Sequence, residues 1–268
     1  MKGRWRGRLP RGFWRAVVSA RHRLLLLDYD GTLAPFRLRR DGAVPFPGAR
    51  AILERVAAAP ATSVAVVSGR RLEPLARLLR TSGVELVGEH GWEVRRRDGR
   101  VSRKEVPKRR REALEEAMAS AREAGFGARL ERKRASVVLH TRGLPPARAR
   151  ALQRACASLW GGGSDGGLLR LVPIDGGIEL RAPGRDKGTA VRDLLEACPT
   201  GTLPVFLGDD ATDEDAFRAV RARGFGIRVG PSARRSFASG RIRSCAGVRA
   251  FLARWLEEVA SSEEGGDR

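Results

Sequence analysis

Short, continuously apolar runs alternate with amphipathic segments through the first and last thirds of the chain. The runs at 24–28 (LLLLD) and 63–68 (SVAVVS) end in an acid or a serine, as strands buried on both faces of a parallel sheet do. Between the runs, apolar positions recur every three or four residues, which predicts helices. Because strands and helices alternate, we expect an α/β fold with a Rossmann-like parallel-sheet core. Strands are expected at 24–28, 63–68, 84–87, 204–208 and 225–229, and helices at 47–58, 73–80, 187–197, 213–220 and 246–259.

The middle of the chain has a different order of elements. The pattern predicts, in turn, a helix at 108–124, strands at 128–133 and 136–140, a helix at 146–160, a glycine-rich turn at 161–167, and strands at 168–173 and 177–181. This αββαββ order indicates a two-layer α+β unit inserted into the core as a lid. The expected domains are a basic N-terminal lead-in at 1–20 with a helix at 13–20, a catalytic core at 21–104 and 183–260, a cap domain at 105–182, and a flexible tail at 261–268.

Length and composition are those of a folded protein. With 268 residues, 42% of them hydrophobic, the chain can bury a substantial core. No stretch approaches the roughly 20 apolar residues that cross a bilayer, and the basic N-terminus lacks the apolar segment of a signal peptide. We therefore expect a cytoplasmic monomer with no membrane partner. In such a compartment Cys156, Cys198 and Cys245 are expected to be reduced thiols.

The chain carries a formal net charge of +21. An excess of basic residues is typical of nucleic-acid-binding proteins. Here, however, nearly all the positive charge comes from scattered arginines, without the aromatic interleaving of a nucleic-acid module. The clusters at 95–97 and 108–111 are interpreted as solvated surface rather than as a binding patch. We therefore expect no nucleic-acid partner, although the positive field would attract a small anionic substrate.

The strongest chemical signal is the acidic motif after the first strand, Asp28-Tyr29-Asp30-Gly31-Thr32. Ligands of open α/β sheets bind at the carboxyl ends of the strands. Two carboxylates at such an edge are costly unless a cation neutralises them. With Mg²⁺ present, one carboxylate can attack phosphorus and the other can transfer a proton. A surface Asp-Gly turn is the alternative for this segment taken alone.

Three further segments place suitable groups at strand ends or at the start of a helix. Ser68-Gly69-Arg70 offers a hydroxyl and backbone N–H groups to a phosphate oxygen. Lys187 opens a helix, and its compact ammonium suits phosphoryl charge. The run 209–215 (DDATDED) has five acids in seven residues, which repel one another unless a cation shares the space. Each segment alone could be a turn, a surface lysine or a helix cap, but together they predict a phosphatase site.

In this order the motifs DxDGT, SGR, DKG and GDDxTDED resemble those of the haloacid-dehalogenase superfamily of phosphohydrolases. The fuller segments LLLLDYDGTLAPF, GEHGWEV, ERKRASVVLHTR and PVFLGDDATDEDAF are similar to the trehalose-6-phosphate phosphatase family, over about residues 24–229. The resemblance implies a Rossmann-like core with an αββαββ cap and a Mg²⁺ cofactor. It also implies hydrolysis of a sugar phosphate, trehalose 6-phosphate, through an aspartyl-phosphate.

The resemblance implies a role for each matching residue. Asp28 would be the nucleophile and Asp30 the general acid/base. Ser68 and Lys187 would bind the transferring phosphoryl group. The side chains of Asp28 and Asp209 and the backbone carbonyl of Asp30 would hold Mg²⁺. Support for the metal and for Lys187 would come from Asp210 and Asp213, and the substrate-binding residues would be Arg70, His90, Glu131, Lys133, His140, Arg142 and Glu179.

Some positions depart from the family or have an ordinary alternative. Gly176 and Gly177 stand where family members often carry a lysine, and Ala182 interrupts an Arg-Pro or Lys-Pro pair. The cap charges could instead be surface groups, and His90 could be a loop histidine. Another sugar phosphate, such as sucrose phosphate or mannosylglycerate phosphate, therefore stays open as substrate. A non-catalytic binding protein on the same fold is the second alternative, against which the intact catalytic acids argue.

Overall fold

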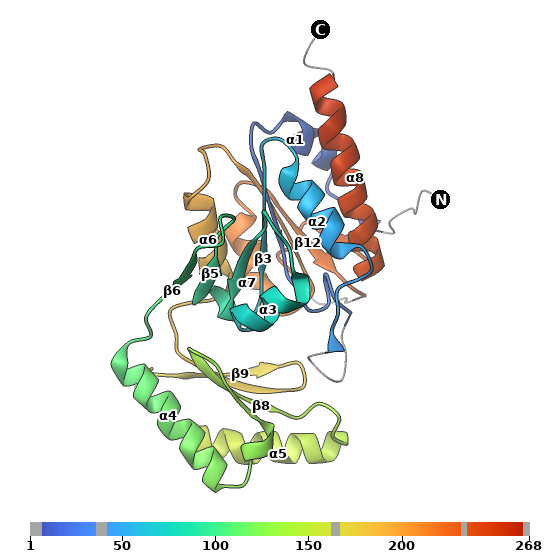
Figure 1. Cartoon of the computed structure of the whole chain (residues 1–268). Coiled ribbons are helices and arrows are strands. Elements are labelled where there is room, and N and C mark those ends of the chain that lie inside the picture. Colours follow the sequence, from blue (N-terminus) through green and yellow to red (C-terminus); the bar gives the residue numbers. More distant parts are fainter. Residues whose placement is uncertain (1–6, 36–41, 162–166, 232–234, 265–268) are drawn as a thin grey trace. The chain divides into compact units, whose positions relative to one another are not determined.

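The computed structural model describes residues 7–35, 42–161, 167–231 and 235–264, and it has the expected α/β fold (Figure 1). The chain divides into two compact units. One contains Met1–Ser102 and Asp186–Arg268, and the other contains Arg103–Arg185. The range expected for the cap, 105–182, lies inside the second unit.

A mainly parallel sheet forms the centre of the first unit. Over the described residues its strand order is β1-β13-β12-β11-β2-β3-β4-β5-β6. The pairs from β13 to β4 are parallel, whereas β1 and β5 run antiparallel to their inner neighbours. The strands are β1 (Gly7–Arg8), β2 (Arg23–Leu27), β3 (Thr62–Val67), β4 (Glu85–Gly88), β5 (Glu93–Arg95), β6 (Val101–Arg103), β11 (Leu203–Gly208), β12 (Phe225–Val229) and β13 (Gly240–Ile242).

Helices cover both faces of this sheet (Figure 1). Because side chains alternate along a strand, Leu25 and Leu27 of β2 belong to one core cluster and Leu24 and Leu26 to the other. The first face packs against α1 (Phe13–Ser19), α2 (Ala49–Ala58), α3 (Leu72–Leu79) and α8 (Cys245–Glu264), and the second against α6 (Lys187–Glu196) and α7 (Asp213–Val220). The continuous apolar runs thus reflect burial on both faces.

Helix α1, within the range 1–20 that was expected to be a lead-in, is part of the core. Phe13 and Val17 of α1 are fully buried, and the Phe13 ring lies 5.0 Å from that of Phe225 in β12, edge-on. Arg23 ties the end of α1 to β2, since its guanidinium donates to the carbonyl oxygens of Val17 and Val18. At the other end, α8 continues through residues 261–264, which were expected to be a flexible tail.

The second unit is a two-layer arrangement of helices on a sheet. Its antiparallel sheet has the order β7-β8-β10-β9. Leu114, Met118 and Trp160 on its helices are buried, and Trp160 Nε1 donates to the carbonyl oxygen of Ala117, 3.0 Å away. The elements are α4 (Lys108–Glu123), β7 (Leu130–Arg132), β8 (Ser136–His140), α5 (Pro146–Gly161), β9 (Arg170–Ile174) and β10 (Gly177–Arg181).

Most differences from the predicted elements concern short pieces. The strands β1, β5, β6 and β13 have only two or three residues each and were not predicted. Most of the glycine-rich turn expected at 161–167 lies outside the described residues. Within the described ranges, none of the helices is both long and apolar enough to cross a membrane.

Candidate active site

The carboxyl ends of three neighbouring strands bring the predicted motifs to one edge of the sheet. The strands β11, β2 and β3 are adjacent and parallel. Asp209, Asp28 and Ser68 are the residues that directly follow them. Segments far apart in the chain therefore meet where ligands of open α/β sheets bind.

Lys187 joins two of the acids at this edge. Its Nζ donates to Asp28 Oδ1 and to Asp213 Oδ1, both at 2.6 Å, and the lysine is only 3% exposed. Asp186 precedes it as the N-cap of α6: its side chain accepts a hydrogen bond from the backbone N–H of Thr189 (2.7 Å), and Thr189 Oγ1 accepts one from the backbone N–H of Asp186 (2.7 Å). This capping box fixes the first turn of α6 and so the direction of Lys187.

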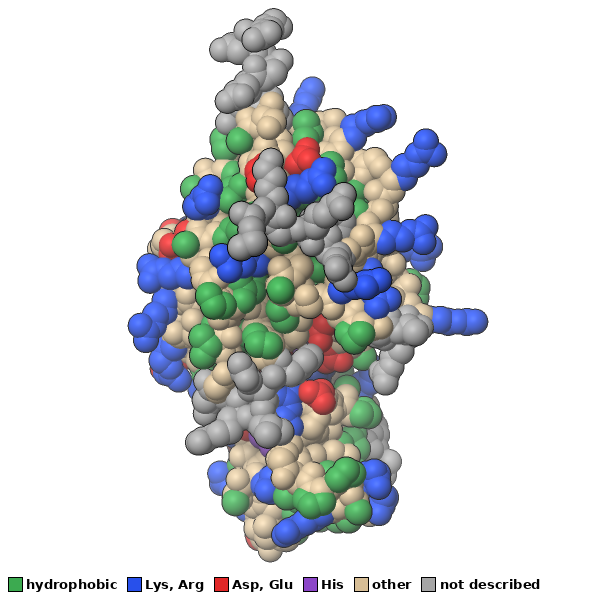
Figure 2. Space-filling view, turned by 90° about the vertical axis from the view of Figure 1, so that its right-hand side faces the viewer, with side chains coloured by type: hydrophobic (Ala, Val, Ile, Leu, Met, Phe, Trp, Pro, Cys, Tyr) green, Lys and Arg blue, Asp and Glu red, His purple; other side chains and the backbone are tan. Residues whose placement is uncertain are grey.

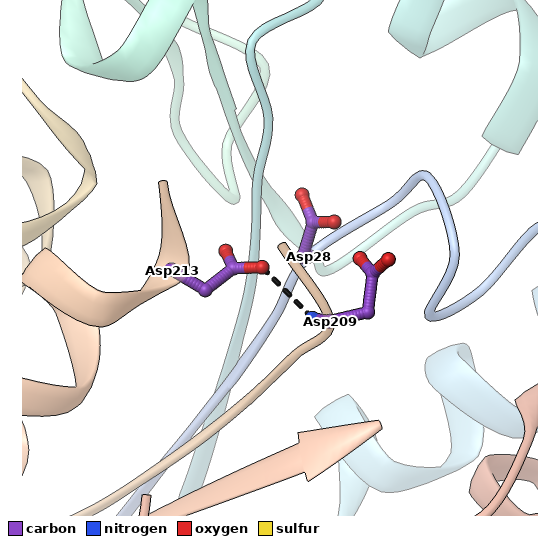
Figure 3. A group of neighbouring side chains, drawn as sticks. All are labelled: Asp28, Asp209 and Asp213. Atoms are coloured by element: carbon purple, nitrogen blue, oxygen red, sulfur yellow. Dashed lines mark hydrogen bonds between the residues drawn. The ribbon is translucent and has the colours of Figure 1, made fainter. Parts of the chain in front are cut away.

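Asp213 organises the loop between β11 and α7. Its Oδ2 accepts hydrogen bonds from the backbone N–H groups of Asp209 and Asp210, both at 2.8 Å, while its Oδ1 accepts from Lys187. Figure 3 shows Asp213 with Asp28 and Asp209, and ligand atoms of the three carboxylates lie within 4.8 Å of one another. The Asp210 carboxylate accepts from the backbone N–H of Ala211 instead. Asp28 and Asp209 are therefore the acids best placed to bind a cation.

Glycines allow the acids to approach so closely. Gly31 has a φ of +78°, and a Cβ added there would lie 2.2 Å from Asp209 Oδ2. A Cβ at Gly208 would lie 2.4 Å from Asp213 Cγ. A side chain at either position would displace a carboxylate, so the motif needs glycine for space as well as for backbone conformation.

The charges at this edge do not balance. Burial raises the pKa of Asp28 well above its ordinary value, and Asp213 and Asp209 add to this effect while Lys187 opposes it. Burial and the Asp213 carboxylate raise the pKa of Asp209 to about 7. Burial disfavours the charge on Lys187, but Asp213 and Asp28 outweigh it and raise the pKa of that lysine. Three carboxylates against one ammonium leave a surplus of negative charge.

A divalent cation fits this surplus. Asp209 Oδ1 is buried and accepts no hydrogen bond from the part of the chain that the structure describes. An unpartnered buried oxygen is costly unless a ligand satisfies it. Carboxylate and carbonyl oxygens are the ligands that Mg²⁺ prefers, so the donor set suits that ion.

Asp30 is held by Arg70. The guanidinium forms two parallel hydrogen bonds, from Nε to Asp30 Oδ2 (2.7 Å) and from Nη2 to Asp30 Oδ1 (2.6 Å). The Arg70 guanidinium also lies over the Tyr29 ring, 5.0 Å from its centroid, and Tyr29 in turn donates to the carbonyl oxygen of Ala43. Such a fork is geometrically specific. Arg70, expected to contact the substrate, thus contacts the predicted acid/base residue.

Ser68 begins the tight turn 68–70, and the loop that contains His90 packs against this turn. Ser68 is buried, its Oγ accepts from the backbone N–H of Arg70, and its carbonyl oxygen accepts from that of His90. The His90 ring lies against Gly69, where an added Cβ would be 2.7 Å from Nε2. Glu89 and His90 both have positive φ, at 47° and 57°, and such strained residues concentrate at functional sites. His90 thus lies beside the predicted phosphate-binding turn.

The remaining predicted residues lie in the second unit, and four of them form two pairs. His140 Nε2 and Glu131 Oε2 are 2.7 Å apart, and both side chains are partly exposed. Lys133 and Glu179 are instead buried, 3% and 2% exposed, with Lys133 Nζ 2.9 Å from Glu179 Oε1. Glu131 and Glu179 both lie opposite Val138, so they share one face of the sheet, and the two pairs differ in burial rather than in side.

Arg142 occupies the space next to the departures at 176 and 177. It forms an ion pair with Asp175 (2.7 Å). A Cβ at Gly176, whose φ is +73°, would lie 2.1 Å from Arg142 Cγ, and a Cβ at Gly177 would lie 2.1 Å from the carbonyl oxygen of Leu139. Glycine is therefore required at both positions while Arg142 and β8 lie where they do.

The sequence analysis assigned no role to Arg228 and Glu214, which lie next to the site. Arg228 donates from Nη2 to the carbonyl oxygen of Asp209 (3.0 Å) and from Nη1 to Glu214 Oε1 (3.0 Å). An arginine inside the apolar run 225–229 was the signal in the sequence, because a buried guanidinium needs partners.

The distribution of basic side chains and the state of the cysteines can be described directly. On the face in Figure 2, Lys and Arg side chains are scattered rather than gathered into one patch. Cys156, Cys198 and Cys245 are free cysteines. Burial raises the pKa of Cys156 to about 12, so its thiol is inert at neutral pH.

Comparison with known proteins gives a consistent set of relatives. A profile described as trehalose-phosphatase matches residues 26–241. A trehalose-phosphate phosphatase of Mycobacterium marinum is 35% identical over 213 residues, 76% of this chain and 53% of that protein, so this chain spans about half the length of that relative. A probable trehalose-phosphate phosphatase of Sinorhizobium fredii is 32% identical over 231 residues, 85% of this chain and 86% of that protein. The solved C-terminal domain of trehalose-6-phosphate phosphatase from C. albicans has a TM-score of 0.77 at 20% identity, covering 95% of this chain and 99% of that one, and shares the fold.

Proposed function

Because the chain belongs to the trehalose-phosphatase family, we propose that it is a magnesium-dependent phosphatase that converts trehalose 6-phosphate and water into trehalose and inorganic phosphate. The observation that carries this proposal is the buried group of Asp28, Lys187 and Asp213 with Asp209 beside it. A carboxylate oriented by a lysine, next to acids that a cation would neutralise, suits attack on a phosphate ester.

We assign Mg²⁺ to the side chains of Asp28 and Asp209 and to the backbone carbonyl of Asp30. The buried, unpartnered Oδ1 of Asp209, a statement that covers the described residues, supports this assignment. Both oxygens of Asp213 already accept hydrogen bonds, so Asp213 would support the loop and Lys187 rather than the ion. When bound, Mg²⁺ would supply positive charge that stabilises the phosphoryl oxygens in the transition state.

In the first half-reaction, Asp28 acts as the nucleophile. Lys187 holds Oδ1, so Oδ2 attacks phosphorus while the bond from phosphorus to the sugar oxygen breaks. That oxygen takes the bonding electrons and a proton from Asp30, and trehalose leaves. Lys187 and the Ser68 hydroxyl oppose the charge on the phosphoryl oxygens during the transfer.

In the second half-reaction, the aspartyl-phosphate on Asp28 is hydrolysed. Asp30 accepts a proton from water as the water oxygen attacks phosphorus, the bond to Asp28 breaks, and inorganic phosphate leaves. Both steps need the Asp30 carboxyl group near the reacting oxygen. The two hydrogen bonds from Arg70 support such a fixed position.

The second unit would recognise the sugar. Glu131, His140 and Arg142 carry polar groups on partly exposed side chains, and carboxylates and cations suit hydroxyl groups. Lys133 and Glu179 are buried against each other, so we assign them to support of the sheet that presents the other three.

We also propose a cytoplasmic location. Free cysteines are typical of a reducing compartment, and the three thiols support this assignment. Recovery of the native protein in the cytosolic fraction of its cell would test it.

The direct test is phosphate release from trehalose 6-phosphate by the wild type and by Asp28→Asn, with Mg²⁺ or with excess EDTA. We expect turnover only in the wild type with Mg²⁺, and turnover by Asp28→Asn would contradict the assigned nucleophile. Sucrose phosphate and mannosylglycerate phosphate belong in the same assay, because Gly176 and Gly177 depart from the family. A higher kcat/KM for either of them would replace trehalose 6-phosphate as the substrate.

A further inference from the structure

A charged side chain occupies an interior position of β12. Arg228 is 8% exposed and lies in the strand Phe225–Val229, in which the other residues are glycine or apolar. In the parallel pairing of β11 with β12, Arg228 lies opposite Gly208, the residue before Asp209. Burying a guanidinium at such a position is costly unless hydrogen bonds and an opposite charge compensate it.

The partners of Arg228 lie around Asp209. Its Nη2 donates to the backbone carbonyl of Asp209, and its Nη1 donates to Glu214 Oε1, both at 3.0 Å. Glu214, in the first turn of α7, accepts at Oε2 from the backbone N–H of Phe237 (2.8 Å). One guanidinium therefore ties the end of β11 to the start of α7, and Glu214 extends this link to the segment after β12.

The hydrogen bonds of Arg228, called the clamp below, complement those that Asp213 makes to the same loop. Asp213 holds the backbone N–H of Asp209, and Arg228 holds its carbonyl. With both peptide groups fixed, the Asp209 side chain has few directions available, and its carboxylate lies against Gly31 and near Asp28. Arg228 also brings positive charge to a segment with five acids in seven residues.

We propose that Arg228, oriented by Glu214, is a positioning residue that sets the Asp209 carboxylate for the divalent cation. The inference rests on the proposed function, because it assumes that Asp209 binds Mg²⁺. A lysine could keep the charge, but its single ammonium lacks the fixed spacing of the two Nη groups that reach Glu214 and the Asp209 carbonyl.

The test is calorimetric titration of the metal-free full chain with Mg²⁺, for the wild type, Arg228→Gln, Arg228→Lys and Arg218→Gln. Arg218 is the matched control, because it pairs with Asp215 in the same acidic segment but is exposed. Replacement of a residue that orients a metal ligand typically weakens metal binding about 10–100-fold. We expect a loss of that size for Arg228→Gln, a smaller loss for Arg228→Lys, and wild-type affinity for Arg218→Gln.

Thermal unfolding with and without Mg²⁺ separates positioning from stability. If Arg228→Gln unfolds at a lower temperature but binds Mg²⁺ as tightly as the wild type, the inference is wrong and the clamp is purely structural. If Arg228→Gln does not fold, the Mg²⁺ affinity of Arg228→Lys is the test instead. Wild-type affinity in a less stable Arg228→Lys would then show that the inference is wrong. Failure of trehalose 6-phosphate as substrate would leave these binding results unaffected, whereas a wild type that binds no Mg²⁺ would overturn both the metal assignment and the inference.

Discussion

Each unit of the molecule buries a lysine against a carboxylate, but the two sites differ in their charge balance. In the first unit Lys187 meets Asp28 and Asp213, with the Asp209 carboxylate nearby. In the second, Glu179 Oε1 accepts from Lys133 (2.9 Å) and from Ser136 Oγ (2.7 Å). Glu179 Oε2 accepts from Arg181 Nε (2.6 Å).

The difference shows why burial of an ion pair does not by itself identify a reactive site. At the first site acids outnumber the lysine, and within the described residues Asp209 Oδ1 has no hydrogen-bond partner. A divalent cation would complete such a site. At the second site two cations and a hydroxyl already contact one carboxylate, which supports our assignment of Lys133 and Glu179 to a structural role. The excess of carboxylates over the lysine, rather than the buried lysine itself, indicates a reactive site.

The largest expected effect comes from Lys187→Met. Because we assign Lys187 to oppose phosphoryl charge and it is buried, we expect kcat for trehalose 6-phosphate to fall about 10³-fold, the upper end for loss of one charge-stabilising donor. Steady-state kinetics at saturating Mg²⁺ measure this loss. Lys108→Met, which removes an exposed lysine paired with Glu112, is the control. A loss of less than tenfold for Lys187→Met would contradict the catalytic role that distinguishes Lys187 from Lys133.

Lys133→Met tests the other half of the comparison. It leaves the Glu179 carboxylate buried with one cation fewer, and breaking a buried ion pair costs about 3 kcal/mol or more. Denaturant unfolding is expected to show this loss, with kcat retained in the folded protein. A variant of wild-type stability with a tenfold higher KM would instead place Lys133 against the sugar.

A smaller effect is expected from Gly31→Ala, compared with Gly201→Ala. Both glycines have a φ near +80°, but an added Cβ meets the Asp209 carboxylate at 31 and nothing within 4 Å at 201. Both variants lose about 1 kcal/mol of stability from the left-handed backbone. Gly31→Ala is expected to weaken Mg²⁺ binding about tenfold in addition, because the added Cβ displaces the Asp209 carboxylate and changes around a metal ligand weaken binding by such factors. Equal Mg²⁺ affinities in the two variants would separate Gly31 from the cation site.

The long buried strands and the acidic edge were predictable from the sequence for a physical reason. A strand buried on both faces, such as β2 or β3, must be apolar throughout, and polar residues can return only where it ends. Topology then brings Asp28, Ser68 and Asp209 together without any further information.

The parts that escaped prediction depend on partners distant in the chain. Phe13 and Val17 stand in an arginine-rich part of the sequence, where their apolar pattern is weak. Their burial depends on contacts with β12 and α8. The role of Arg228 could not be predicted, because Glu214 and the Asp209 carbonyl that accept its hydrogen bonds come from other elements. Whether a cap charge such as Lys133 is exposed or buried likewise depends on Glu179, 46 positions away.

The most direct test of the account is the number and affinity of Mg²⁺ ions bound by the wild type and by Asp209→Asn in calorimetric titrations at neutral pH. Since Asp28 and Asp209 are assigned to a single ion, the wild type is predicted to bind one Mg²⁺, and the neutral amide is predicted to weaken that binding at least ~100-fold. If Asp209→Asn binds Mg²⁺ with the affinity and stoichiometry of the wild type, the surplus of acid at this edge does not serve a cation and the account is wrong.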